Sequence, residues 1–272
     1  MTHVSQYPDH SEAAEALEHG SGRGIKVAVI DSGIELSHPW LRGLRLVDDI
    51  AFSSTPKGEP RRLAGRGVDP NGHGTAIAWL IRKAAPEAQL GSFRVLGADL
   101  SSSFRLIESA AMLAIDRGYN ILNCSFGTLA KIESIQRFKS WVDHAYRLGV
   151  HVVCPCNNFF FREPEWPGSF PSVISVNMAA TQDGDLFFRT DPAGYGTRAH
   201  LVEFAARGVN LEVPWQNGST TRKTGSSFAA AHATGMLARF LSRHPGVKPP
   251  VAKSLLQELA TPWHDSLSAA ND

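Results

Sequence analysis

The chain has 272 residues, of which 43% are hydrophobic and 19% are charged, a composition typical of a globular rather than a disordered protein. Its 27 basic and 26 acidic residues give a net charge of +1, so no basic field indicates a nucleic acid or an anionic membrane as partner. No apolar stretch approaches the roughly 20 residues that a transmembrane helix needs. The first ten residues contain neither a basic nor an apolar segment, so we expect no signal peptide.

The cysteine content favours a reducing compartment. Cys124, Cys154 and Cys156 are too few, and odd in number, for the disulfide framework of a small secreted domain. Taken alone, Cys154 and Cys156 are also compatible with a redox pair or metal ligands. Since no second Cys/His cluster completes a zinc site, we interpret them as small buried residues with free thiols. These observations together predict a cytoplasmic protein.

The chain alternates short apolar runs with longer segments of helical periodicity. In chain order, we predict a helix over 11–19 with Ser11 as its N-cap, strands over 25–30 and 90–96, a helix over 104–116, a strand over 120–125, a helix over 132–148, strands over 150–154 and 173–176, and a helix of small residues that runs to Arg239. Residues 61–71 and 183–197 are polar and contain Gly and Pro, so we predict loops there.

This alternation predicts an α/β fold, with a mainly parallel sheet and helices on both of its faces. We find no linker and no internal repeat, so we expect a single domain over 1–272, with a core of about 11–262 and short extensions at both ends. Functional groups in such a sheet gather just beyond the carboxyl ends of the strands. Asp31, the segment 125–127 and the pair Asn157-Asn158 all follow predicted strands.

Three segments contain the residue types of nucleophilic acyl transfer. Asp31 ends a predicted strand, His73 lies in Asn-Gly-His-Gly-Thr at the start of a helix, and Ser227 begins the helix of small residues. A serine hydroxyl needs an imidazole base, and the imidazole needs a carboxylate to fix its tautomer. An aspartate at a strand end is by itself more often a turn former than a catalyst, so the hypothesis depends on all three together.

Five segments in order resemble the subtilisin-like serine peptidases. They are residues 33–39 after the aspartate, 71–75 around the histidine, 122–127, 150–158, and Gly-Ser-Ser-Phe-Ala at 225–229. The order Asp, His, Ser is also that of the family. The resemblance runs from about residue 11 to about 262, and it implies the subtilisin-like fold and peptidase activity.

The resemblance implies a role for each matching residue. Ser227 is the expected nucleophile, His73 the general base and then acid, and Asp31 the carboxylate that orients the imidazole. Asn158 and the backbone N–H of Ser227 are expected to form the oxyanion hole. Asn157 stands where the family usually has glycine, so a register shifted by one residue stays open.

The resemblance also implies a cleft for an extended peptide. Leu100, Ser101 and Ser102 on one side, and Ser125, Phe126 and Gly127 on the other, are expected to pair with the main chain of the substrate. Glu165 precedes Trp166 where the family often has a glycine at the floor of the primary specificity pocket. A carboxylate there predicts Arg or Lys at P1, the residue on the acyl side of the scissile bond. The alternative is that Glu165 turns outward to solvent.

The chain departs from the family in a way that bears on metals. Residues 81–86 cross directly from the His73 helix to the next strand, so the family's calcium-binding loop is missing and we expect no metal site and no cofactor. Few residues precede Asp31, so we also expect no folding propeptide. Trp79 stands where the family usually has glycine, which requires different local packing.

The predicted function is that of a serine endopeptidase that acts on a peptide or protein substrate. A peptide-maturation protease or macrocyclising transpeptidase stays an alternative, and a non-catalytic peptide-binding protein is a weaker one. We expect no nucleic acid and no membrane as partner. A regulatory partner or inhibitor is compatible with the sequence, which does not identify it.

Overall fold

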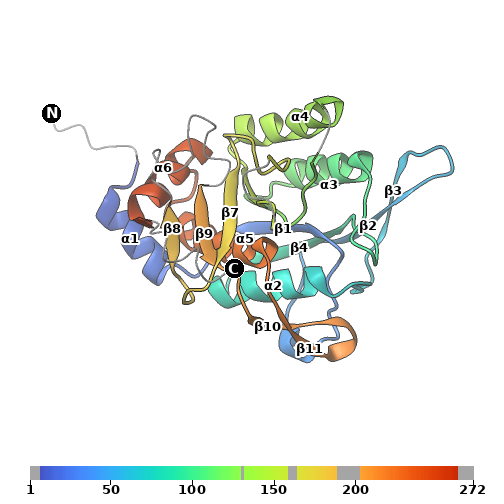
Figure 1. Ribbon diagram of the computed structural model, residues 1–272, viewed down its shortest axis with the longest axis horizontal. Coiled ribbons are helices and arrows are strands. Elements are labelled where there is room, and N and C mark those ends of the chain that lie inside the picture. Colours follow the sequence, from blue (N-terminus) through green and yellow to red (C-terminus); the bar gives the residue numbers. More distant parts are fainter. Residues whose placement is uncertain (1–6, 130–131, 159–163, 189–202, 263–272) are drawn as a thin grey trace.

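The structure is a computed structural model of the chain, and it describes residues 7–129, 132–158, 164–188 and 203–262. Its centre is a ten-stranded sheet in the order β12-β8-β9-β7-β6-β5-β1-β4-β2-β3 (Figure 1). The strands are β1 (Lys26–Asp31), β2 (Asp49–Ser54), β3 (Pro60–Ala64), β4 (Gln89–Arg94), β5 (Ile121–Cys124), β6 (His151–Pro155), β7 (Ile174–Ala179), β8 (Leu186–Phe188), β9 (Phe204–Arg207) and β12 (Thr261–Pro262). All neighbours pair in parallel except β2 with β3 and β8 with β9.

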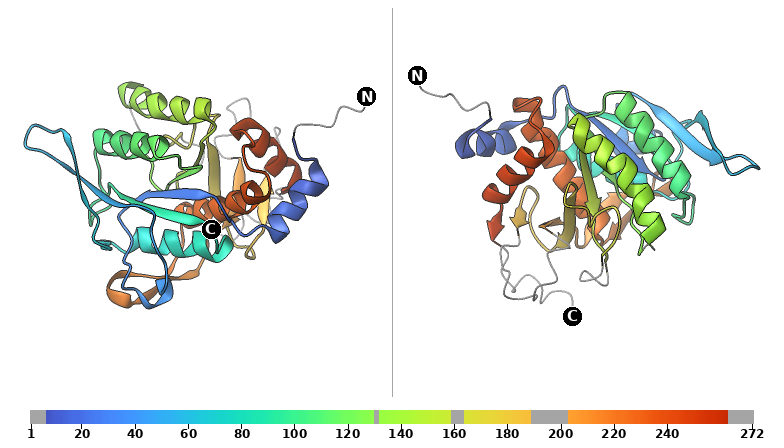
Figure 2. Two further views of the ribbon diagram at one scale, coloured as in Figure 1. Left: turned by 180° about the vertical axis from the view of Figure 1, so that it is seen from behind. Right: turned by 90° about the horizontal axis from the view of Figure 1, so that it is seen from above.

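The predicted parallel α/β architecture is confirmed. The helices are α1 (His10–His19), α2 (His73–Ala84), α3 (Phe104–Asp116), α4 (Ile132–Leu148), α5 (Ser226–Arg243) and α6 (Pro249–Leu259). In Figures 1 and 2, α3 and α4 cover one face of the sheet, and α2 and α5 cover the other. Apolar side chains fill a separate core on each side, one between the sheet and α2 and α5, the other beneath α3 and α4.

The register of the central strands explains why their sequences are almost wholly apolar. Alternate residues of β1 point to opposite faces, so Val27 and Val29 lie in one core while Ala28 and Ile30 lie in the other. Because both faces are covered by helices, every one of these positions is buried. The polar residue that ends the strand, Asp31, therefore stands out in the sequence.

The N-terminal helix begins at His10, one residue earlier than expected, and its N-cap is Asp9 rather than Ser11. The Asp9 carboxylate accepts the backbone N–H of Glu12 at 2.9 Å, and the Glu12 carboxylate accepts that of Asp9 at 2.9 Å. This reciprocal capping box satisfies two amides, whereas a cap at Ser11 leaves the preceding turn unpaired.

Both predicted loops contain a strand. Residues 60–64 form β3, which pairs antiparallel with β2, and residues 186–188 form β8, which pairs antiparallel with β9. All five residues of β3 are exposed, so the strand has no apolar alternation by which the sequence could indicate it. The rest of the second predicted loop, from residue 189 on, lies outside the described residues.

Two short 3₁₀ helices, η1 (Pro39–Leu41) and η2 (Gln216–Gly218), and a small hairpin complete the fold. The hairpin strands β10 (Leu211–Pro214) and β11 (Thr220–Lys223) pair antiparallel. Their turn packs against the start of α2, where an added Cβ on Gly72 would lie 2.9 Å from the Trp215 ring. Within the described residues, no helix is long and apolar enough to cross a membrane.

Candidate active site

Asp31 and His73 form a buried, hydrogen-bonded pair at the carboxyl edge of the sheet. Asp31 is fully buried at the end of β1, and its two carboxylate oxygens lie 2.8 and 3.0 Å from His73 Nδ1. The Asp31 Oδ1 atom also accepts the backbone N–H of Ser32 at 2.7 Å. A carboxylate so fixed holds Nδ1 protonated and leaves Nε2 as the free base.

The electrostatics of His73 follow from this pair. Burial lowers the pKa of His73, but the charge and the hydrogen bond of Asp31 outweigh it, so the pKa lies above its ordinary value. The imidazolium is therefore stabilised, which favours a base that takes up a proton during a reaction.

The start of α2 is built for close approach to β1. An added Cβ on Gly74 would lie 2.1 Å from the Gly33 carbonyl oxygen, so only glycine fits there. The Asp69 carboxylate accepts the backbone N–H of Thr75 at 2.8 Å and its hydroxyl at 2.7 Å. These contacts fix the first turn of α2 and thereby the position of His73. This positioning role of Asp69 was not predicted from the sequence. The available signal was an acidic residue just before the predicted start of the His73 helix.

Ser227 lies in the first turn of α5, beside the histidine. The ring of the next residue, Phe228, packs against the His73 imidazole with centroids 5.5 Å apart. The Ser227 hydroxyl donates to the Ser125 carbonyl oxygen at 3.5 Å, and no hydrogen bond joins it to His73 among the described residues. Catalytic hydrogen bonds are often long without substrate and tighten when it binds.

Asn158 is held against the residue that precedes the candidate nucleophile. Its Oδ1 atom accepts the backbone N–H of Ser226 at 2.8 Å and lies 2.8 Å from the Ser226 hydroxyl, which also donates to the Cys156 carbonyl at 2.7 Å. With Oδ1 occupied, the amide N–H groups are the part of Asn158 left to face a ligand. Asn157 is buried, whereas Asn158 contacts the start of α5; its role in an oxyanion hole stays a prediction. The positioning role of Ser226 escaped the sequence analysis.

Among the described residues, the two segments expected to bracket a peptide leave part of their backbone without a hydrogen-bond partner. Within 97–102, the Gly97 N–H donates to the Ser101 carbonyl at 2.9 Å, and Asp99 accepts the Ser101 N–H at 3.1 Å. The described residues give no such partner to the backbone of Ser102. The Leu100 N–H donates to the Gly97 carbonyl at 3.0 Å and its φ is +61°, so this loop is closed on itself at Leu100 and presents Ser102 to an added strand.

The opposite segment is anchored by a bridge to the loop that carries Glu165. Thr128 and Trp166 exchange two backbone hydrogen bonds of 3.0 Å, which sets Ser125, Phe126 and Gly127 beside that loop. The backbones of Phe126 and Gly127 have no recorded partner among the described residues, so they are open to pairing.

The Glu165 side chain lies across Gly127. An added Cβ on Gly127 would fall 2.5 Å from the Glu165 carboxyl carbon, so the two are in close contact. Burial raises the pKa of Glu165, and its charge contributes to raising the pKa values of Cys154 and Cys156. No cation of the described residues pairs with this carboxylate. Glu165 is therefore a half-buried, unneutralised acid at the cleft rather than an outward surface residue.

The remaining polar groups singled out in the sequence have structural surroundings. The three cysteine thiols are free and buried, and Trp79 packs on Trp40 with centroids 4.9 Å apart. The described residues contain no cluster of three or more His, Cys, Asp or Glu side chains suited to a metal ion. Residues 85–88 connect α2 with β4, and the absence of a metal site stays a prediction.

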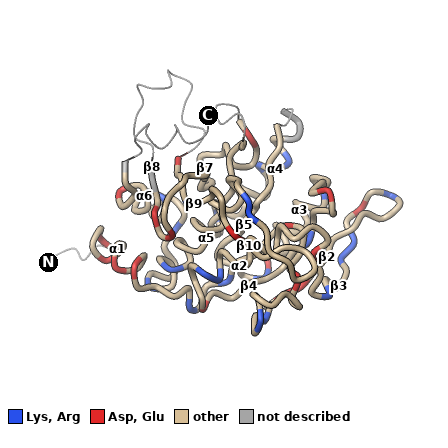
Figure 3. The backbone as a smooth tube through the Cα atoms, turned by 60° about the horizontal axis from the view of Figure 1, so that its bottom comes forward, with Lys and Arg blue, Asp and Glu red and all other residues tan. Residues whose placement is uncertain are grey.

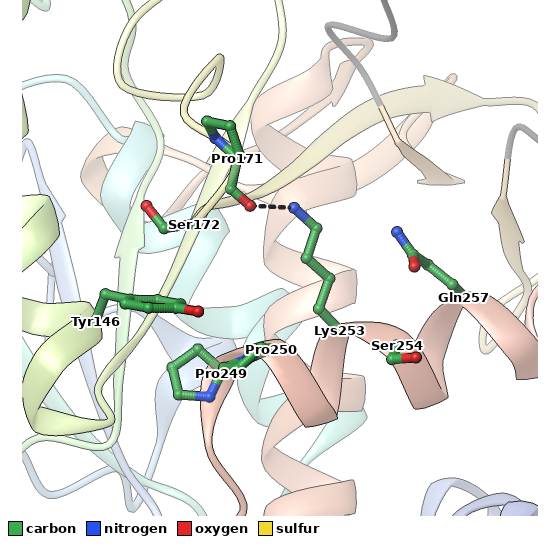
Figure 4. Close-up of a pocket in the computed structure, with 8 residues that line it drawn as sticks. All are labelled: Tyr146, Pro171, Ser172, Pro249, Pro250, Lys253, Ser254 and Gln257. Atoms are coloured by element: carbon green, nitrogen blue, oxygen red, sulfur yellow. Dashed lines mark hydrogen bonds between the residues drawn. The ribbon is translucent and has the colours of Figure 1, made fainter.

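A separate pocket of about 200 Å³ lies near the start of β7, at the opposite edge of the sheet. It is lined by Tyr146, Pro171, Ser172, Pro249, Pro250, Lys253, Ser254 and Gln257 (Figure 4). The Lys253 ammonium donates to the carbonyl oxygens of Pro171 at 2.6 Å and Val173 at 3.0 Å and pairs with Glu203 at 2.5 Å. Because the Lys253 ammonium already has these partners within the protein, we propose no ligand or reaction for this pocket.

A buried carboxylate and imidazole beside a serine at a helix N-terminus are typical of hydrolases with a serine nucleophile. Residues 22–270 match the subtilase family. Subtilisin DY of Bacillus licheniformis is 27% identical over 90% of this chain and 86% of its own length, and the major intracellular serine protease of Bacillus subtilis is 28% identical over 86% and 75%. The structure of sphericase superposes with a TM-score of 0.69 at 26% identity, over 88% of this chain and 83% of that one.

The chain therefore belongs to the subtilase family, which places it among the subtilisin-like serine peptidases. The fold and family inferred from the sequence are both confirmed.

Proposed function

We propose that the protein is a serine endopeptidase in which Asp31, His73 and Ser227 act together. The observation that carries the proposal is the buried contact of 2.8 Å between Asp31 and His73, with the ring of Phe228, the residue after Ser227, packed on the imidazole. Membership of the subtilase family supports the same roles.

The reaction follows from the positions of these side chains. The Ser227 oxygen attacks the peptide carbonyl carbon while His73 Nε2 takes the hydroxyl proton, and Asp31 stabilises the imidazolium. The oxyanion accepts hydrogen bonds from the Asn158 side-chain amide and from the Ser227 backbone N–H at the start of α5. His73 returns the proton to the leaving amine, and the C–N bond breaks to give the acyl-enzyme. Water, deprotonated by His73, then attacks the ester and releases the acid and Ser227.

We propose a preference for Arg or Lys at P1, based on Glu165. Its carboxylate is half-buried against Gly127 and lacks a cationic partner among the described residues. A carboxylate removed from water gains most from a cation, and an arginine would bind it through two parallel hydrogen bonds. The pocket would therefore favour a basic side chain over an apolar one.

Two experiments test the proposal at different levels. A peptide-library cleavage profile of the purified protein, with Ser227→Ala as the blank, should give cleavage by the wild type alone. Cleavage by both proteins would assign the activity elsewhere, and binding without cleavage would favour a non-catalytic peptide-binding protein. Mass spectrometry of the products separates hydrolysis from transfer to an amine, which is the macrocyclising alternative.

The P1 preference needs its own matched set of peptides. Peptides that differ only in Arg, Lys, Leu or Phe at P1 are assayed with the wild type, Glu165→Gln and Glu165→Gly. We expect the wild type to prefer Arg and Lys, and both variants to lose that preference because the charge is gone. A wild-type preference for Phe or Leu, or an unchanged Arg-to-Leu ratio in Glu165→Gly, would contradict the assignment.

We also propose a cytoplasmic location. Its support is the similarity to proteins named as intracellular, such as the intracellular serine protease of Paenibacillus polymyxa, 27% identical over 80% of this chain and 66% of its own length. The free thiols are compatible with a reducing compartment. The partner we propose is a peptide or protein substrate, neither a nucleic acid nor a membrane. Cell fractionation followed by immunoblotting tests the location.

A further inference from the structure

A solvent-exposed hairpin extends from the end of the main sheet. It consists of β2, β3 and the turn between them, and it projects beyond the rest of the fold (Figures 1 and 2). Strand β3 is the last strand of the sheet and is exposed along its whole length. Exposed edge strands are sites of association with another chain unless they are protected.

The hairpin carries a concentration of positive charge. Lys57 lies in its turn, Arg61 and Arg62 lie on β3, and Arg66 follows β3; the turn and β3 contain one acid, Glu59, and Figure 3 shows blue positions along this segment. Asp49 begins β2, and its carboxylate accepts the backbone N–H of Gly67 at 2.6 Å. All four basic side chains are exposed, and the structure gives none of them an ion-pair or hydrogen-bond partner among the described residues. On a chain whose net charge is only +1, this is a local basic surface that attracts an acidic partner.

The outer edge of β3 offers backbone groups as well as charge. The Gly65 N–H donates to the Asp49 carbonyl at 2.9 Å, so Gly65 faces β2. Residues of an antiparallel pair alternate, and therefore Arg62 and Ala64 turn their N–H and C=O groups away from β2. An extended polypeptide can pair with these groups, whereas a nucleic acid would use only the charges. The open edge favours a polypeptide as the partner.

The turn of the hairpin contacts the start of α3, next to one wall of the proposed peptide cleft. The Arg105 guanidinium donates to the Gly58 carbonyl in the turn at 3.5 Å, and Arg105 is the second residue of α3. Helix α3 follows the segment 100–102, which is one wall of the cleft. With P1 at Glu165, a substrate runs from there along 125–127 and 100–102 toward the start of α3. The hairpin therefore faces residues N-terminal to the scissile bond.

We propose that the β2–β3 hairpin is a docking surface for an acidic, extended segment of the protein substrate, located N-terminal to the cleaved bond. The inference rests on the proposed peptidase function and adds a second recognition element to it. Acidic side chains would pair with Lys57, Arg61 and Arg62, and the chain would lie along the free edge of β3. Such exposed ion pairs are weakened by salt.

The test uses two fluorogenic peptides with the same residues around a P1 arginine. Their N-terminal extensions differ, one rich in Glu and Asp and the other in Gln and Asn. We expect the acidic extension to raise kcat/KM of the wild type about fivefold at low salt, as several exposed ion pairs allow. The double variant Arg61→Glu/Arg62→Glu should lose this increase and cleave an unextended peptide like the wild type. The matched control is Arg45→Glu/Lys248→Glu, two exposed cations away from the hairpin, which should retain the increase.

A binding measurement separates this inference from the peptidase function. Fluorescence anisotropy with labelled peptides and the Ser227→Ala protein requires no cleavage. Tighter binding of the acidic peptide, lost in Ser227→Ala/Arg61→Glu/Arg62→Glu and at about 1 M salt, supports the docking surface even if no peptide is cleaved. Equal binding of both peptides overturns it, even if both are cleaved.

A third experiment tests whether the basic hairpin binds a nucleic acid instead of an acidic peptide. Mixed-sequence duplex DNA is titrated into the same proteins at physiological salt. We expect no binding above that of the double variant, because four cations neutralise too few phosphates for tight association at physiological salt. Hairpin-dependent DNA binding tighter than that of the acidic peptide would overturn the proposal.

Discussion

The carboxyl edge of the sheet and the β2–β3 hairpin are opposites in construction. At the edge, Asp31 and His73 are buried, and the close packing around them leaves no room for a larger residue at Gly74. On the hairpin, every residue of β3 is exposed and its cations have no partner among the described residues. The comparison teaches that the proposed chemistry lies where packing fixes the side chains, whereas the proposed substrate docking uses a surface that packing leaves free.

The largest expected effect is the loss of the three residues at the edge. Ser227→Ala and His73→Ala should each lower kcat by about 10⁶, and Asp31→Asn by about 10⁴, because the three act as one unit. Steady-state kinetics on a P1-arginine peptide measures this. Near-wild-type turnover in either of the first two variants would contradict the catalytic role of the carboxyl edge of the sheet.

Asn158 should have the next largest effect. Asn158→Ala is expected to lower kcat by about 10² to 10³ with little change in KM, since its hydrogen bond strengthens as the oxyanion forms. Ser226→Ala, which frees the Asn158 side chain from its anchor, should lower kcat by less. If Asn157→Ala gives the large loss and Asn158→Ala does not, the register of the oxyanion hole is shifted by one residue.

The two regions should differ as sharply in stability as in activity. Gly74→Ala brings a Cβ to 2.1 Å from the Gly33 carbonyl oxygen, so we expect it to lower the free energy of unfolding by about 3 kcal/mol. Arg62→Glu changes an exposed side chain without a partner and should shift it by less than about 0.5 kcal/mol. Urea unfolding followed by circular dichroism compares them. If both variants lost the same free energy of unfolding, Arg62 would have to be packed against the rest of the protein.

The pH dependence of kcat/KM tests the electrostatics of the buried pair. His73 must be neutral to act as a base, and its raised pKa places the acid limb above the ordinary histidine value of about 6.5. In Asp31→Asn the charge that raises the pKa of His73 is removed while burial still lowers it. The acid limb of the residual activity should therefore shift to lower pH. A limb that stays in place in Asp31→Asn would contradict this account.

Metal removal should have the smallest effect. The described residues contain no cluster suited to a metal ion, and the sequence predicts that the family's calcium-binding loop is missing after the His73 helix. A metal bound only to the folded state stabilises it by mass action, so its removal would be visible in the melting temperature. We expect chelation to shift Tm by less than about 2 °C. A large drop that calcium reverses would contradict the prediction.

The same contrast explains what the sequence could reveal. The central strands and the polar end of β1 at Asp31 were predictable because burial on both faces makes strands apolar and leaves a polar end conspicuous. The segments around His73 and Ser227 begin helices, and only their resemblance to a known family singled them out. The β3 strand was not, because a fully exposed strand has no alternation. Contacts between distant segments, such as Ser226 with Asn158 and Glu165 with Gly127, follow from the packing of loops onto the sheet, which local patterns do not encode.

The most direct test of the central claim is labelling with a fluorophosphonate, which reacts covalently with an activated serine hydroxyl. We predict one adduct on the folded wild-type protein, located on Ser227 by mass spectrometry of its peptides. His73→Ala should react far more slowly, and Ser227→Ala not at all. An unlabelled wild type in its folded state, or an adduct on another residue, would contradict the assignment of Ser227 as the nucleophile.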